Sequence, residues 1–99
     1  MAPEKYVSQD ELRSLFSHGR YYERMQQGEF MPEVHDVGPS PSRFSSDVRS
    51  QTVAYIDQAG RTIVIVHQYG YDNGDVAENA LPDPKFIFEK GVRYKLLRA

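Results

Sequence analysis

The stretch Arg61-Thr62-Ile63-Val64-Ile65-Val66-His67-Gln68-Tyr69 contains a run of five β-branched residues, Thr62 to Val66. β-Branched side chains favour strands because they pack well on a pleated surface. From Ile63 to Val66 every position is apolar, so both faces of the strand carry apolar side chains. This pattern is typical of a central strand that is covered on both faces. We therefore expect Ile63 and Ile65 to be buried.

A second β-rich segment, Gln51 to Ile56, precedes this strand across the spacer Asp57-Gln58-Ala59-Gly60. The spacer has the residues of a type I turn that ends in a left-handed glycine. The two segments are therefore predicted to form an antiparallel hairpin, with its register set by Asp57 facing Arg61.

The last hairpin runs from Lys85 to Leu97, and two registers compete for it. A two-residue turn at Lys90-Gly91 would place Phe88 opposite Arg93. A three-residue turn would place Phe88 opposite Val92. We expect the second register because it gathers apolar side chains on one face of the hairpin. These side chains are Phe86, Phe88, Val92, Tyr94 and Leu96.

The N-terminal third is predicted to be helical. Ser8-Gln9-Asp10-Glu11 has the pattern of a capping box, and it predicts a helix over residues 9–18. A second helix is expected from Arg20 to Gln27. The prolines and glycine between residues 29 and 46 favour a loop there.

The predicted fold class is α+β. One N-terminal helix, with the second shorter one, packs on a small antiparallel sheet of about four strands built from the two C-terminal hairpins. We expect a single domain over residues 1–99, helical over 8–28, a loop over 29–46 and sheet over 47–99.

Composition excludes several classes of protein. The chain has 99 residues, of which 39% are hydrophobic and 26% charged, as in a soluble globular domain. No apolar run approaches the ~20 residues that cross a bilayer, so no membrane association is expected. The chain contains no cysteine, which excludes disulfides and thiolate metal sites. We expect a cytoplasmic protein without a cofactor.

His67 is the one candidate catalytic residue. It continues the alternation of Ile63 and Ile65 near a strand end, and histidine suits acid–base work at neutral pH. Several small ribonucleases place such a histidine on an antiparallel sheet, although shared architecture does not confer function. We favour a structural hydrogen bond for His67. His35-Asp36 could join it around a metal, but the ligand spacing is missing, so no metal site is predicted.

Candidate binding residues come from two groups. Four tyrosines fall near the ends of predicted elements, where a ring packs while its hydroxyl stays wet. They are Tyr21, Tyr22, Tyr69 and Tyr71. The second group is Arg93 and Lys95, from the basic C-terminal strand. Basic residues interleaved with aromatic ones are typical of single-stranded nucleic-acid surfaces. The expected register turns these rings inward, so we interpret the cations as a guard against edge pairing.

These patterns predict a small non-catalytic binding domain that engages a protein partner. The block from Val66 to Tyr94 resembles a small bacterial or phage accessory protein. A homodimer is compatible with the sequence. The alternative is a metal-independent ribonuclease-like or nucleic-acid-binding domain that uses His67 and the basic C-terminal strand. The net charge of −2 makes nucleic acid the less favoured partner.

Overall fold

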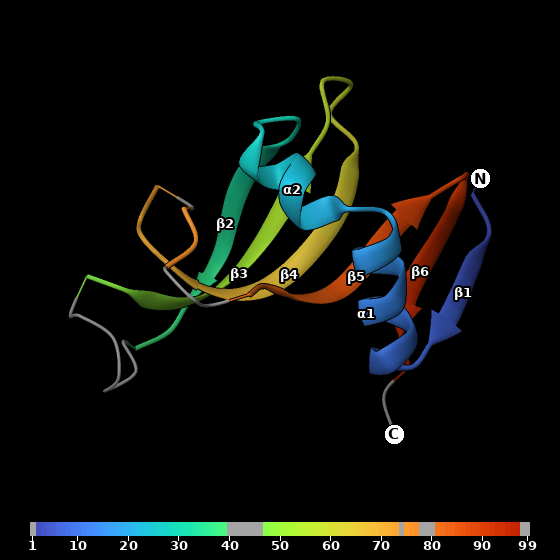
Figure 1. Cartoon of the computed structure of the whole chain (residues 1–99), viewed down its shortest axis with the longest axis horizontal. Coiled ribbons are helices and arrows are strands. Elements are labelled where there is room, and N and C mark those ends of the chain that lie inside the picture. The colour runs from blue at the N-terminus through green and yellow to red at the C-terminus, as the bar shows by residue number, and fades with distance from the viewer. Residues whose placement is uncertain (1, 40–46, 74, 78–80, 98–99) are drawn as a thin grey trace.

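The described part of the chain folds into two helices on one six-stranded sheet (Figure 1). The computed structural model describes residues 2–39, 47–73, 75–77 and 81–97. The sheet order is β1-β6-β5-β4-β3-β2, with β1 parallel to β6 and every other pair antiparallel. The predicted α+β class is therefore confirmed. The elements are β1 (Glu4–Val7), α1 (Gln9–His18), α2 (Tyr21–Gln26), β2 (Met31–Val37), β3 (Arg49–Ile56), β4 (Thr62–Gly70), β5 (Asp83–Glu89) and β6 (Val92–Leu96).

Helix α1 begins at the predicted capping box. The Ser8 hydroxyl accepts a hydrogen bond from the Glu11 amide at 3.1 Å, and the Glu11 carboxylate accepts one from the Ser8 amide at 3.5 Å. These bonds satisfy amides that have no partner within the helix. Arg20, at φ 55°, reverses the chain before α2.

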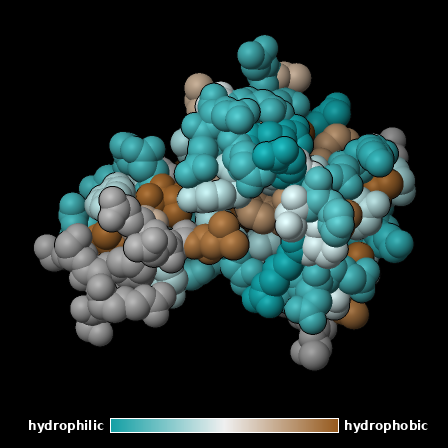
Figure 2. Space-filling model, viewed as in Figure 1, coloured by the Kyte–Doolittle hydropathy of each residue, from teal (hydrophilic) through white to brown (hydrophobic). Residues whose placement is uncertain are grey.

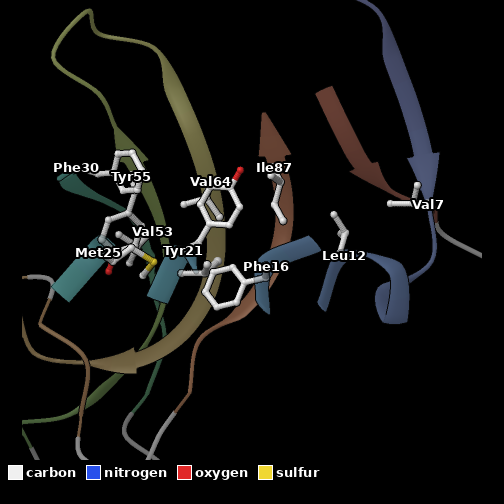
Figure 3. Close-up of a cluster of buried hydrophobic side chains, with 11 residues drawn as sticks. Val7, Leu12, Phe16, Tyr21, Met25, Phe30, Val53, Tyr55, Val64 and Ile87 are labelled. Carbon is white, nitrogen blue, oxygen red and sulfur yellow. The ribbon is translucent and has the colours of Figure 1, made fainter. Parts of the chain in front are cut away.

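The core lies between the helices and one face of the sheet. Figure 3 shows side chains from α1 and α2 directed at β3, β4 and β5. Burial of these apolar side chains is the main source of stability. The buried cluster contains Val7, Leu12, Phe16, Tyr21, Met25, Phe30, Val53, Tyr55, Val64, Val66 and Ile87.

Two strands were missed by the sequence prediction. β1 precedes the first helix, and β2 lies inside the segment 29–46 that was expected to be a loop. Both are edge strands. Proline is tolerated at a sheet edge, because its missing N–H can point to solvent, so Pro32 does not prevent β2. Residues 40–46 of the predicted loop lie outside the described part of the chain.

Strand β4 is central, but only one of its faces is covered. Val64 and Val66 are fully buried under the helices and Ile63 packs against the same core, whereas Ile65 on the other face is partly exposed. The expected burial on both faces was therefore wrong, because both helices lie on the same side of the sheet (Figure 1). The predicted register holds beside the turn, where the Asp57 amide donates to the Arg61 carbonyl at 2.9 Å and Ile56 pairs with Thr62. A bulge at Ile63 then shifts the pairing by one residue from Tyr55–Val64 onward.

The last hairpin uses the register that the sequence analysis rejected. Phe88 pairs with Arg93 across a two-residue turn, in which Lys90 (φ 49°) and Gly91 (φ 79°) are both left-handed. This is the geometry of a type I′ turn, and glycine suits its second position. The prediction gathered the larger number of apolar side chains on one face and left Ile87 on the other face with the cations, whereas the observed register buries Ile87 completely. Phe86 and Phe88 consequently face away from the helices.

Polar side chains extend the buried face of the sheet beyond the helices. Tyr55 donates a hydrogen bond to the Gln68 side-chain oxygen at 2.9 Å, and Gln68 donates to Gln51 at 3.2 Å. Gln51 in turn donates to the Tyr71 carbonyl at 2.7 Å. A Cβ at Gly70 would lie 2.6 Å from the Asp75 carbonyl oxygen, so this glycine lets the loop after β4 close over the network.

The capping box should contribute measurably to stability. We expect Ser8→Ala to lower the free energy of unfolding by about 1 kcal/mol, because it leaves an amide of the first turn without a partner. Glu11→Ala should lower it less, since its bond to the Ser8 amide is longer. Urea unfolding of both variants and the double variant measures this, and the two effects should not add. An unchanged midpoint for Ser8→Ala would contradict the role of the cap.

The buried phenol of Tyr55 should make the protein sensitive to alkali. Burial raises the pKa of Tyr55 to about 12. Between about pH 10 and 12 the unfolded chain therefore loses a proton that the folded chain keeps, so stability falls as the pH rises. In Tyr55→Phe the free energy of unfolding should fall less steeply over this pH range, by about 1.4 kcal/mol per pH unit. Urea unfolding at several alkaline pH values measures both slopes, and identical slopes would contradict the assignment.

Candidate functional site

The face of the sheet turned away from both helices is called the open face here. Strand alternation places on it the side chains that pair with, or lie two residues from, Phe86 and Ile65. Figure 2 views the opposite, helix side, where hydrophilic residues dominate the surface of the helices. The open face carries Glu4, Tyr6, Met31, Glu33, Asp36, Ser50, Thr52, Ala54, Ile56, Thr62, Ile65, His67, Tyr69, Phe86, Phe88, Arg93 and Lys95.

Aromatic rings and cations gather at one end of the open face. Tyr6, Lys95 and Phe86 lie side by side on neighbouring strands β1, β6 and β5. In the next row Arg93 lies beside Phe88, and the Arg61 guanidinium carbon stands 4.9 Å from the centroid of the Phe88 ring. We call this set the ring–cation patch: Tyr6, Arg61, Phe86, Phe88, Arg93 and Lys95.

The ring–cation patch is hollowed and reachable by solvent. A pocket of about 490 Å³ is lined by its two phenylalanines and its three cations, together with Ala2 and Thr62. The Tyr6 ring beside it is 58% exposed, and the Arg93 and Lys95 side chains are 41% and 38% exposed. A flat ligand could therefore contact both rings and cations.

One carboxylate enters the patch from β1. The Glu4 Oε1 atom lies 2.7 Å from Lys95 Nζ and 3.7 Å from Arg93 Nη1. The hydrogen bond from Lys95 and the positive charges of both side chains lower the pKa of Glu4. The patch thus holds three cations and one carboxylate. Glu33, another acid of the open face, is on β2, about 19 Å from β6 at the usual strand spacing.

His67 lies on the open face in a separate polar cluster. Its Nε2 atom is 2.8 Å from the Ser50 hydroxyl oxygen, and its ring meets the Tyr69 ring edge-on with the centroids 5.3 Å apart. Acid–base cleavage of a phosphodiester needs a second proton-transfer group or a cation beside the histidine. Among the described residues, neither a carboxylate nor a guanidinium is bonded to His67. The geometry favours a structural hydrogen bond between His67 and Ser50 over an acid–base role for His67.

The four tyrosines proposed for binding lie in different places. Tyr21 is buried in the core, where it donates a hydrogen bond to Glu89 at 2.9 Å, so it offers no surface. Tyr22 is half-buried on the helix side. Tyr69 lies on the open face beside His67, and Tyr71 begins the loop that follows β4. Arg93 and Lys95, by contrast, lie two residues apart on the same face of β6.

Sequence reasoning missed the two rings that accompany Arg93 and Lys95. Phe86 and Phe88 were placed inward by the three-residue turn that the sequence analysis preferred. The signal that could have found them is Ile87 between them, since a β-branched aliphatic residue is the better candidate for the fully buried position. Arg61 was overlooked because it adjoins a turn and comes near Phe88 only through the pairing of β4 with β5.

The helix side has a second hollow of about 470 Å³ between α1, α2 and residues 81–84. Its lining combines apolar side chains with Arg13, Glu23 and Asp83. In the described ranges no group of three histidine, aspartate or glutamate side chains could hold a metal ion. Neither helix is long and apolar enough to span a bilayer.

Comparison with known proteins adds no relative to this picture. No protein-family model matches the chain, and it has no significant match among curated proteins or solved structures.

Proposed function

We propose that the open face of the sheet binds single-stranded nucleic acid through the ring–cation patch. The observation that carries this proposal is the pairing of Phe88 with Arg93 and of Phe86 with Lys95 on the solvent side of the last hairpin. Bases would stack on the rings, and phosphates would contact the cations. In this proposal the open face is a binding surface and not a catalytic centre.

The rings support the proposal through stacking. Single-stranded RNA is recognised on sheets whose exposed aromatic side chains stack with two or three bases. Tyr6 and Phe86 flank Lys95 in one row, and Phe88 lies two residues from Phe86 along the same strand. A stacked base is worth about 1–3 kcal/mol at such a ring. The patch therefore has the number of rings that a short strand of bases requires.

The cations support it through local charge. The net charge of the chain is −2, whereas most nucleic-acid-binding proteins are basic. Exposed charges act mainly within a Debye length, about 8 Å at physiological salt. Arg61, Arg93 and Lys95 line one pocket, so a strand in the patch meets these cations more strongly than the distant acids.

A protein partner is the second candidate, and strand β2 favours it. β2 is an edge strand with an unpaired side, and two of its apolar side chains are well exposed, Met31 at 73% and Val37 at 58%. A partner could extend the sheet there by adding a strand. Pro32 and the bulge between Val34 and Asp36 restrict such pairing. A second copy of the chain would reveal itself as a concentration-dependent mass in sedimentation, which Met31→Lys should abolish.

The stacking role of Phe86 gives the main test. Phe86→Leu keeps an apolar side chain on the strand but removes the aromatic face. We expect it to weaken binding of a short single-stranded oligonucleotide by about 1–3 kcal/mol. Fluorescence anisotropy at low salt measures the affinity, and Met31→Leu on the far edge of the same face is the matched control. Equal affinities of wild type and Phe86→Leu would refute stacking at this ring.

Salt dependence and cleavage complete this test. Glu4 neutralises one of the three cations, so two effective phosphate contacts remain, and the logarithm of the binding constant should fall with the logarithm of salt at a slope of about −1.4. We expect the oligonucleotide to remain intact in both wild type and His67→Ala. Cleavage that disappears in His67→Ala would instead support the ribonuclease alternative.

A further inference from the structure

We infer that the Glu4 carboxylate marks a phosphate subsite between Lys95 and Arg93, and that Glu4 competes with nucleic acid for this subsite. The inference rests on the proposed function, because it names the anion that the ring–cation patch would receive. The ligand class is a phosphodiester of a single strand. The competitor is part of the chain itself.

The geometry of the contact is that of an anion bound by two cations. Glu4 Oε1 is 2.7 Å from Lys95 Nζ, a charge-assisted hydrogen bond, and 3.7 Å from Arg93 Nη1. A phosphate oxygen offers the same charge and the same acceptor geometry. Lys95 and Arg93 face the same side of β6, two residues apart, so one anion can contact both.

The backbone of β1 holds Glu4 in this position. The Pro3 carbonyl accepts a hydrogen bond from the Arg93 amide at 2.9 Å, and the Val7 carbonyl accepts one from the Leu97 amide at 2.7 Å. Glu4 is thereby placed beside Arg93 in the parallel register of β1 and β6. Its side chain must lie on the open face, because Val7 at the other end of the strand is buried in the core. Competition therefore follows from strand pairing and not from a chance surface contact.

Removing the charge of Glu4 should strengthen binding. Exposed ion pairs contribute at most about 1 kcal/mol, so Glu4→Gln should raise affinity about three- to sixfold at low salt. The variant exposes one more effective cation, so the salt slope should steepen from about −1.4 with two effective contacts toward about −2.1 with three. The gain in affinity should shrink as salt increases.

The experiment measures the dissociation constant of a short mixed-sequence oligonucleotide, as RNA and as DNA, by fluorescence anisotropy. The variants are Glu4→Gln, Glu33→Gln, Lys95→Gln and the double variant of Glu4 and Lys95. Glu33→Gln is the matched control, because it makes the same change in net charge on the same face but on the far edge strand. We expect little change in Glu33→Gln, and loss of the Glu4→Gln gain when Lys95 is also replaced. Urea unfolding of each variant verifies that the fold is kept.

The outcomes separate this inference from the proposed function. If Glu4→Gln and Glu33→Gln bind equally while Phe86→Leu binds more weakly than wild type, the surface is right and the competing role of Glu4 is wrong. A gain in Glu4→Gln that persists without Lys95 also overturns the subsite. If neither wild type nor Glu4→Gln binds at low salt, the proposed function fails, and the inference fails with it.

Discussion

The complete burial of Ile87 is the constraint on which the surface of this protein depends. Side chains alternate between the two faces of a strand, so fixing Ile87 beneath the helices forces its neighbours on β5 to the other face. The same pairing turns Tyr94 inward and Arg93 and Lys95 outward. The competing register would keep Arg93 and Lys95 outward but turn Phe86 and Phe88 inward, which would leave the aliphatic Ile87 in water. The packing of one side chain thus determines the chemistry of the open face.

Contacts between α1 and β5 reinforce this constraint from the covered side. The Arg13 guanidinium bonds to Asp83 at 2.9 Å, and this contact holds the pKa of the Asp83 carboxyl below its usual value. Gln9 joins the same group, because it donates to the Pro84 carbonyl at 2.8 Å and accepts from Lys85 at 2.9 Å. Each exposed pair contributes little alone. Together they attach the first turns of α1 to the start of β5, immediately before the residues that form the patch.

Local signals in the sequence were read correctly, whereas long-range geometry was not. The capping box predicted α1 with its observed bounds, because hydrogen bonds between residues three apart define it. β1 was missed because a parallel edge strand of four residues pairs with a segment almost ninety positions away. The turn at Lys90-Gly91 was visible, but both of its registers bury apolar side chains. Ile87 between the two phenylalanines is the one local signal for the observed register, and its packing against Leu12 and Phe16 of α1 is a long-range contact that the hairpin sequence alone does not reveal.

The sign of the overall charge is a weak guide to such a site, and the arrangement of this sheet shows why. Strand order separates Glu33 on β2 from Arg93 and Lys95 on β6 by the full width of β5, β4 and β3. That distance exceeds the Debye length at physiological salt, so the acidic edge scarcely reduces the potential at the basic one. Glu4 is different, since it is paired directly beside the cations. A single carboxylate in that position affects an incoming phosphate more than the net charge of the whole chain does.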